Sequence, residues 1–578
     1  EMTRQIRVVD HIVAQLVGAG VDFMFGVDGA NIEDLYDAAH FSDGITAVLA
    51  KHEFSAATMA DGYSRAGCGL GVVMATSGGG SLNVIPGLGE SFTSRVPVLA
   101  LIGQAPTTMD GNGSFQDTSG RNGALDAEAL FTAVSVYCRR ITTAGDIISA
   151  LPEAISAARR GGPAVLLLPK DIQQSRLPAM PVGEFLPTKS DSDLRPLLQH
   201  IRVAKGPVII LAGEQVARDD ARDELELVRS LLGASTAVVP DAKDVTGTTG
   251  LGAEALLGVT GVMGHTGVAQ AIRNSAVCVI VGTRLSVTAR AGLDEALSRT
   301  AVCSLGSAIP FVPCQHIHSD DLRNSLSQLA TELGSTGPEP AAPTGEDPRQ
   351  GELSTPQHNG RGIRYRDAID ALDEALPDRV DIVVDAGNCG AAAIHTLPVR
   401  RAGRFIVALG MGGMGYSFGA AIGMTFGRQA RHESRRTIAL AGDGSFFVHG
   451  MEIHTAVQYR LPITFVLFNN NAHAMCVSRE QIFYHDLYSY NRFGESSLGA
   501  GLAAMFPGLH AVDVDDPRVL REALGQALST PGPSVVSIRC SADEIPPFAP
   551  FLNERDGHHH STVTTEVQEA IADVPSRS

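Results

Sequence analysis

Short apolar runs that alternate with helix-length segments are the feature that most constrains the fold of this chain. Each run is rich in β-branched residues and leucine, as buried strands are. Continuous apolar strands separated by helices are typical of parallel sheets with helices on both faces. The sequence therefore predicts an α/β fold of doubly wound parallel sheets. The runs are Val72–Thr76, Val98–Gly103, Ala164–Leu168, Val208–Ala212, Val277–Gly282, Ile382–Asp385, Thr437–Gly442, Ile463–Asn469 and Ser534–Arg539.

Two breaks in this alternation predict three domains. In the segment 334–360, Gly, Pro, Ser and Thr replace the apolar residues, which indicates a linker. Prolines between residues 176 and 193 interrupt the pattern more weakly. A chain of 578 residues also exceeds one hydrophobic core, because cores stop growing near about 250–300 residues. We therefore predict domains at 1–180, 190–333 and 361–550, and a C-terminal tail at 551–578.

Composition excludes several classes of partner. The net charge of -18, without any dense block of Lys and Arg, argues against nucleic acid and anionic lipid surfaces. The eight cysteines form no CxxC pair, which favours the reduced thiols of a cytoplasm over disulfides or zinc. No apolar run reaches the length of about 18 residues that a membrane span needs. We therefore expect a cytoplasmic protein with neither nucleic acid nor membrane as a partner.

A glycine-rich turn carries the strongest chemical signal. Ala441–Ser445 reads AGDGS, follows the run Thr437–Leu440 and precedes a helix-like segment, His449–Gln458. Glycines let the backbone approach a phosphate, a helix N-terminus favours its charge, and the Asp443 carboxylate can hold Mg²⁺ beside it. By itself the pattern also fits an ordinary tight turn.

A second polar residue makes this signal specific. Asn470 lies 27 residues after Asp443, at the end of the next apolar run. Neighbouring parallel strands joined by a helix have about this repeat, and their carboxyl ends open on the same crevice. Because carboxylate and amide oxygens are hard ligands, the pair predicts a magnesium site.

GDGS followed after this interval by NN resembles the signature of thiamine-diphosphate (ThDP) enzymes, and the chain as a whole resembles the acetolactate-synthase-like branch of the pyruvate oxidase and decarboxylase superfamily. The resemblance implies a pyrimidine-binding domain, a middle domain and a diphosphate-binding domain, in that order. It implies that Asp443 and Asn470 bind Mg²⁺ through their side chains and Ala472 through its carbonyl. Implied contacts to the diphosphate come from Gly442, Gly444, Ser445, Asn388 and Cys389.

Lys51–Phe54 and the small residues after it resemble the glutamate motif of the same family. By this resemblance the Glu53 carboxylate bonds N1′ of the aminopyrimidine and favours the imino tautomer, whose nitrogen deprotonates C2 of the thiazolium. A glutamate that merely starts a helix, where the helix dipole favours it, is the alternative. Asn83 ends a segment, Gly78–Asn83, that stands where relatives carry a glycine turn and an asparagine, so we expect it among the cofactor contacts.

Leu409–Tyr416 resembles the loop in which a large apolar side chain forces the two rings of the cofactor into a V. Met414 is then that wedge, the Gly412 carbonyl receives the 4′-amino group, and the Met414 N–H reaches N3′. A core methionine is the alternative. The family also places the pyrimidine-binding part of one chain against the diphosphate-binding part of another, which implies a homodimer or homotetramer with active sites at the interface.

The reaction type depends on a third segment. Phe115–Asp117, together with Gln104, resembles the acetolactate synthase pattern, in which Phe115 and Gln116 face the thiazolium; a polar loop residue is the alternative for Gln116. No His pair lies in this loop, and Ala30 stands where simple pyruvate decarboxylases carry an aspartate. These differences favour a carboligase that decarboxylates pyruvate or a related 2-keto acid and transfers the acyl anion to a carbonyl acceptor. The alternatives are a 2-keto-acid decarboxylase or oxidase and, from another class, a non-catalytic subunit.

Three further features bear on ligands. His473 is a candidate to face the cofactor or substrate, with a structural role as the alternative. The small side chains of Cys389–Ala393 and the absence of tryptophan suggest a roomy acceptor pocket. Gly282–Arg284 only loosely resembles a flavin-adjacent segment, so the sequence leaves FAD undecided.

Overall fold

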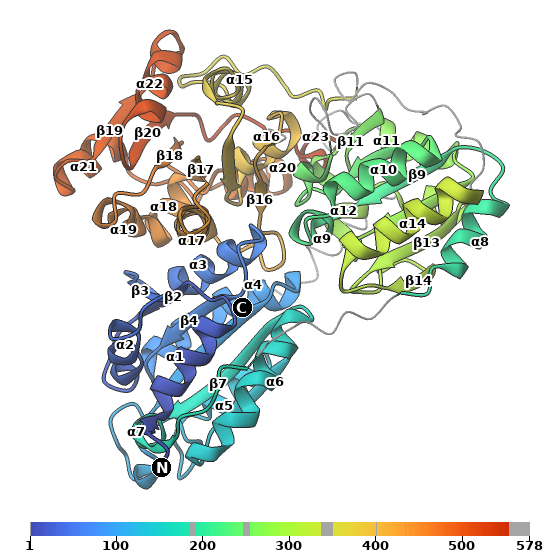
Figure 1. The fold of residues 1–578 in the computed structure, drawn as a ribbon. Coiled ribbons are helices and arrows are strands. Elements are labelled where there is room, and N and C mark those ends of the chain that lie inside the picture. The colour runs from blue at the N-terminus through green and yellow to red at the C-terminus, as the bar shows by residue number, and fades with distance from the viewer. Residues whose placement is uncertain are drawn as a thin grey trace.

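The computed structural model describes residues 2–183, 192–246, 255–336, 351–399, 402–433 and 435–553, and these form three six-stranded sheets covered by helices (Figure 1). Strand pairing within each of the three sheets is parallel. A separate antiparallel pair joins β1 (Gln5–Arg7) to β8 (Arg176–Pro178). The predicted fold class, α/β with three doubly wound parallel sheets, is confirmed.

The first sheet has the strand order β3-β2-β4-β5-β7-β6. Its central strands β4, β5 and β7 are buried along their whole length, because helices cover both faces. The strands are β2 (Phe23–Val27), β3 (Thr46–Leu49), β4 (Gly71–Ala75), β5 (Val98–Gln104), β6 (Tyr137–Arg140) and β7 (Pro163–Pro169). The helices are α1 (Val8–Gly18), α2 (Glu33–His40), α3 (Glu53–Arg65), α4 (Gly79–Ser94), α5 (Ala127–Thr132), α6 (Ile147–Arg159) and α7 (Lys170–Gln174).

The middle sheet has the order β11-β10-β9-β12-β13-β14. Its strands are β9 (Val208–Ala212), β10 (Ser235–Val238), β11 (Leu256–Val259), β12 (Val277–Val281), β13 (Ala301–Gly306) and β14 (Gln315–His318). Its helices are α8 (Arg195–Val203), α9 (Glu214–Arg218), α10 (Arg222–Leu232), α11 (Gly267–Arg273), α12 (Val287–Arg290), α13 (Asp294–Ser298) and α14 (Leu322–Thr336).

The third sheet has the order β16-β15-β17-β18-β20-β19. Its strands are β15 (Val380–Val384), β16 (Phe405–Val407), β17 (Arg436–Gly442), β18 (Ile463–Asn469), β19 (His510–Val514) and β20 (Ser534–Arg539). Its helices are α15 (Tyr365–Ala375), α16 (Asn388–Thr396), α17 (Tyr416–Ala430), α18 (Asp443–His449), α19 (Ile453–Gln458), α20 (Ala474–Phe483), α21 (Leu498–Met505), α22 (Pro517–Ser529) and α23 (Ala549–Asn553).

The first and third domains meet through α3 and α17, which lie against each other at the junction of the blue and orange parts of Figure 1. Glycines make this approach close: a Cβ on Gly423 would lie 1.9 Å from the Met59 carbonyl oxygen. Tyr63 and Phe418, from the two helices, belong to one buried cluster. The first and third domains therefore share a hydrophobic core.

The nine apolar runs coincide with strands of the three sheets, whereas the shorter and partly exposed edge strands β3 and β19 lack so strong a signal. The predicted helix His449–Gln458 begins earlier, at Asp443, and continues through a 3₁₀ turn, Gly450–Glu452. Most of the predicted linker (337–350) and of the tail (554–578) lies outside the described residues, and the residue limits of the domains stay predictions. Within the described part of the chain, no helix has the length and apolar character needed to cross a membrane.

Candidate active site

Asp443 and Asn470 lie together at the carboxyl edge of the third sheet. β17 ends at Gly442 and α18 begins at Asp443, while the parallel neighbour β18 ends one residue before Asn470. The buried Asp443 carboxylate accepts hydrogen bonds from the backbone N–H groups of Asn470 (3.3 Å) and Ala472 (3.1 Å). The ends of β17 and β18 therefore meet at one edge of the sheet, as the 27-residue interval predicts, and the Asp443 carboxylate contacts the segment that follows β18.

The chemistry of these groups fits a hard divalent cation. Burial raises the pKa of Asp443 to about 6, because little nearby positive charge offsets the loss of hydration. The side-chain oxygen of Asn470 is buried and has no hydrogen-bond partner among the described residues. An oxygen left in this state is costly unless a ligand takes it up, and Mg²⁺ takes carboxylate and amide oxygens. The described residues contain no group of three His, Cys, Asp or Glu side chains that could hold a metal, so backbone and amide oxygens must complete the set.

The N-terminus of α16 offers a second unsatisfied group. Neither the oxygen nor the nitrogen of the buried Asn388 amide has a partner of good hydrogen-bond geometry among the described residues, although the Tyr365 hydroxyl is close enough to interact with this side chain. Gly387 precedes it with a φ of +117°, a conformation that favours glycine. Burial raises the pKa of Cys389 to about 12, so this thiol is neutral at physiological pH. A polar ligand such as a diphosphate would satisfy the Asn388 amide.

Asp385 connects the loops around this edge, and sequence reasoning missed it as a site residue. Its buried carboxylate accepts hydrogen bonds from the Gly415 N–H (3.0 Å), from the Ser417 hydroxyl (2.7 Å) and from the Ser445 hydroxyl (3.0 Å). The Ser445 hydroxyl therefore bonds within the protein. The group that Ser445 offers to a diphosphate is its backbone N–H, in the first turn of α18. The position of Asp385 at the end of a predicted strand was the only signal for it.

His473 precedes α20 and faces the glycine turn. A Cβ on Gly444 would lie 2.6 Å from Nδ1 of His473, and the imidazole packs edge-on against Phe493 with ring centroids 4.7 Å apart. The residue is partly exposed. Its ring thus lies next to the candidate diphosphate turn, where both a structural and a ligand-binding role are available to it.

Glu53 is the first residue of α3 and is 9% exposed. The Asn83 amide, from α4, donates a hydrogen bond of 3.1 Å to its carboxylate. A Cβ on Gly80 would lie 2.9 Å from the same carboxylate, which explains why glycine stands there. Asn83 therefore holds Glu53 in place, in addition to any contact that it makes with a cofactor.

Phe115 and Gln116 lie next to the same glycine segment. The Gln116 side-chain oxygen accepts a hydrogen bond of 3.0 Å from the Ser77 hydroxyl. A Cβ on Gly78 would lie 2.8 Å from Cγ of Gln116. Phe115 is 76% exposed. Gln104, by contrast, is buried, and its side-chain oxygen accepts a hydrogen bond from Arg140, so it has a structural role beneath the loop that carries Phe115 and Gln116.

The wedge loop, defined here as residues 409–415, connects β16 to α17 and is largely exposed. Gly412 has a φ of +64° and Gly415 a φ of +94°. Met414 is 37% exposed, so it is not a core methionine in the single chain. Its side chain is available to a ligand or to another subunit.

The site residues thus form two groups in one chain. Glu53, Asn83 and Gln116 belong to the first domain, and the wedge loop, Asn388, Asp443, Asn470 and His473 belong to the third. The groups approach through Phe54, which stacks on His449 with ring centroids 4.1 Å apart. Within the described residues, Glu53 and Asp443 share no hydrogen bond or ion pair, so a subunit interface between them stays a prediction.

A cavity of about 190 Å³ lies where the three domains meet. Arg218 and Arg284 line it, and the Arg284 guanidinium stacks over Phe311 at 4.1 Å. Glu214 and Asp241 face the same space, and burial raises the pKa of Asp241 to about 6. The charges that line this cavity are therefore mixed, with guanidinium and carboxyl groups around one space.

Comparisons with known proteins match this architecture domain by domain. The family models of the thiamine pyrophosphate enzymes match residues 6–124 as the N-terminal TPP-binding domain, 194–303 as the central domain and 385–538 as the C-terminal TPP-binding domain. The acetolactate synthase large subunit of Lactococcus lactis is 25% identical over 594 residues, which cover 97% of each chain. The large subunit of acetolactate synthase isozyme 2 of Escherichia coli is 26% identical, over 94% of this chain and 96% of that one.

A solved structure shows the same fold. Benzoylformate decarboxylase from Polynucleobacter necessarius superposes with a TM-score of 0.78, at 20% identity, over 94% of this chain and all of that one. At this identity the likeness concerns the fold alone. The three domain matches and the full-length relatives show that the chain is an acetolactate-synthase-like member of the thiamine pyrophosphate enzyme family.

Proposed function

We propose that the protein is a ThDP-dependent carboligase, which decarboxylates pyruvate or a related 2-keto acid and transfers the acyl anion to a carbonyl acceptor. The similarity to acetolactate synthase large subunits over nearly the whole chain carries this proposal. The position of Gln116 beside the glycine segment that touches Glu53 supports it. A 2-keto-acid decarboxylase or oxidase on the same fold is the alternative, which the products of the reaction distinguish.

The cofactors of the proposal are ThDP and Mg²⁺. Asp443, Asn470 and the Ala472 carbonyl would hold the metal, and Asn388 with the turn Gly442–Ser445 would hold the diphosphate. The unsatisfied oxygen of Asn470 and the unsatisfied amide of Asn388 support this assignment. When bound, ThDP supplies a nucleophilic carbon and an electron sink for decarboxylation.

The side chains of the protein would then position the cofactor and the acceptor and would exchange protons with the cofactor. Glu53, buried and held by Asn83, would keep its carboxylate against N1′ of the pyrimidine and exchange a proton there. Gln116 accepts a hydrogen bond from Ser77 with its oxygen, which leaves its amide N–H to donate to the acceptor carbonyl. Glu53 and Asp443 are both buried, which limits the contact of each carboxylate with water.

We also propose a homodimer or homotetramer in which Glu53 of one chain faces the diphosphate-binding domain of another. Met411, Met414, Phe447 and Val448 are between 37% and 62% exposed and lie on or beside the candidate site, which supports a covering subunit. A cytoplasmic location is consistent with eight cysteines that form no disulfide within the described residues.

The test is turnover of pyruvate with ThDP and Mg²⁺, with every product identified by mass spectrometry. We expect a hydroxyketone product and a loss of at least about a hundredfold in CO₂ release for Glu53→Gln, because general acid–base groups contribute about 10²–10⁴-fold. Glu128→Gln, an exposed glutamate of the same domain, is the matched control. Free aldehyde or an oxidised acid as the sole product would move the assignment to a decarboxylase or oxidase.

The interface is tested by mixing two inactive variants, Glu53→Gln and Asp443→Asn, and exchanging their subunits. If each active site combines two chains, a mixed dimer holds one site with both residues intact, and about a quarter of all sites recover. If both residues of a site come from the same chain, subunit exchange restores no activity.

A further inference from the structure

The first and third domains are built on the same plan. Their sheets have the orders β3-β2-β4-β5-β7-β6 and β16-β15-β17-β18-β20-β19, which are the same order when strands are numbered within each domain. In this correspondence α3 is equivalent to α17, and the segment after β4 is equivalent to the segment after β17. The packing of α3 on α17 therefore joins two equivalent elements. The segment after β4 reaches the loop that precedes α17, and the segment after β17 reaches the loop that precedes α3.

One contact of this kind holds the loop that carries Glu53. Glu452, from the segment after β17, accepts hydrogen bonds from the backbone N–H of Lys51 (2.9 Å) and from that of His52 (3.0 Å). These amides directly precede Glu53 at the start of α3. A buried carboxylate of the third domain thus holds the catalytic loop of the first.

The equivalent contact holds the wedge loop. Glu90, from α4 after β4, accepts hydrogen bonds from the backbone N–H of Gly410 (3.2 Å) and from that of Met411 (2.6 Å). Asp385 holds the other end of the loop at Gly415. The wedge loop is therefore held at both ends by carboxylates, one of them from the other domain.

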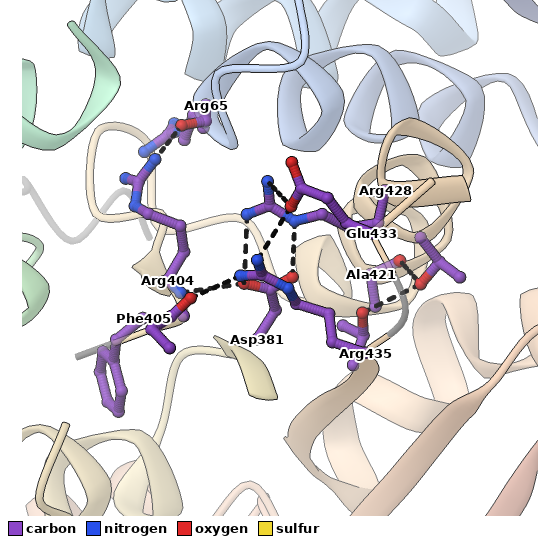
Figure 2. A network of polar contacts seen from close by, with 12 residues as sticks. Arg65, Asp381, Arg404, Phe405, Ala421, Arg428, Glu433 and Arg435 are labelled. Carbon is purple, nitrogen blue, oxygen red and sulfur yellow. Dashed lines mark hydrogen bonds and ion pairs between the residues drawn. The ribbon is translucent and has the colours of Figure 1, made fainter. Parts of the chain in front are cut away.

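Glu90 is kept ionised although it is 5% exposed. Burial opposes its charge, but the Arg65 guanidinium at 2.9 Å and the Met411 N–H outweigh burial, so the pKa of Glu90 lies below its ordinary value. Arg65 is itself fully buried, bonds Asp61 at 2.6 Å and accepts a hydrogen bond from Arg404 at its backbone oxygen (Figure 2). The anion is therefore fixed in position before any ligand arrives.

We propose that Glu90 is a positioning residue for the cofactor: it shapes the wedge loop so that Gly412 and Met414 can receive the aminopyrimidine, as Glu452 does for Glu53. This inference rests on the proposed function, because it assumes that ThDP binds at the wedge loop. A charged carboxylate can accept from both loop N–H groups and from Arg65 together. A glutamine at this position would place its NH₂ group, a donor, where a carboxylate oxygen now accepts. At least one of these hydrogen bonds would then be lost, and the loop would be released.

The experiment measures ThDP binding to the full-length protein by titration calorimetry with Mg²⁺, and the near-ultraviolet circular dichroism of the bound aminopyrimidine. Two variants release the loop by different means. Glu90→Gln removes the charge, and Gly410→Ala leaves the charge but places a Cβ 2.7 Å from the Ser94 hydroxyl and 2.9 Å from the Glu90 carboxylate. Glu128→Gln is again the control, and far-ultraviolet circular dichroism checks that each variant is folded.

We expect both variants to bind ThDP at least about tenfold more weakly than wild type and to change the aminopyrimidine spectrum, since a hydrogen bond to a charged group is worth about tenfold or more in affinity. If Glu90→Gln fails to fold, Gly410→Ala decides. Wild-type affinity and spectrum in a folded Gly410→Ala or Glu90→Gln variant would overturn the inference. If wild type itself binds no ThDP, the proposed function fails first, and this result is distinct from the other.

Discussion

The close contact between α3 and α17 predicts that one added methyl group, in the variant Gly423→Ala, lowers the stability of the protein. A Cβ at this position would lie 1.9 Å from the Met59 carbonyl oxygen and 2.6 Å from its carbonyl carbon. Carbon and oxygen approach one another to about 3.3 Å in proteins, so the helices must separate by about 1.4 Å. The obstacle is backbone, which cannot rotate away as a side chain can.

The magnitude follows from two opposed effects. Overpacking a buried contact costs about 1–3 kcal/mol, whereas replacing a helical glycine by alanine stabilises a helix by about 1 kcal/mol. Gly525→Ala in α22 isolates the second effect, because nothing lies within 4 Å of a Cβ there. We therefore expect Gly423→Ala to be less stable than Gly525→Ala by about 2 kcal/mol, or about 4–8 °C in the unfolding midpoint.

Thermal unfolding followed by circular dichroism, in parallel with urea unfolding, measures this difference. The comparison between the two variants is the useful quantity, since both carry the same chemical change in a helix interior. If Gly423→Ala unfolds at the same temperature as Gly525→Ala or above it, the two helices do not pack at the distance described, and the shared core of the first and third domains must be reconsidered.

Three further outcomes are expected. Because burial raises the pKa of Asp443 to about 6, protons should compete with Mg²⁺ below that pH, and the Mg²⁺ affinity measured by calorimetry should fall about tenfold per pH unit; a flat profile between pH 4 and 6 would contradict this. Asn388→Ala should change the unfolding free energy of the apoprotein by less than about 1 kcal/mol, since its amide has no hydrogen bond of good geometry to lose, and should weaken ThDP binding; unchanged ThDP affinity would count against the diphosphate role. His395, whose Nε2 accepts a hydrogen bond of 2.9 Å from the Leu353 N–H, has a lowered pKa because of burial, and that of its stacked neighbour His265 is lowered to about 3. The unfolded chain therefore binds more protons below about pH 6.5, so the unfolding midpoint should decrease as pH falls below this value, and less steeply in His395→Gln; equal slopes would refute it.

The Asp443 and Asn470 pair was predictable because both residues sit at the ends of buried strands in one continuous strand–helix–strand unit. The apolar runs define the strands, the 27-residue interval defines the connection, and the handedness of such units brings the two ends together. The position of Glu53 at the first turn of a helix followed instead from the resemblance of its local motif to the glutamate motif of the family.

The surroundings of these residues were not predictable in the same way. Asn83 was expected as a cofactor contact, and its amide is found bonded to Glu53; the Ser445 hydroxyl is found bonded to Asp385. Both contacts depend on side-chain directions that are decided only when the elements pack. Whether these residues also touch the cofactor stays a prediction.

The sequence by itself determined the three α/β domains and the residues at the strand ends, because apolar periodicity and turn chemistry act over a few residues of chain. Only the tertiary structure decided that Glu90 holds the wedge loop and that Glu452 holds the loop of Glu53. These partners are 321 and 400 residues apart, and no periodic or local signal connects them. Their pairing follows from the close packing of α3 on α17, where glycines allow two backbones to meet and bring each domain's carboxylate to the other's loop.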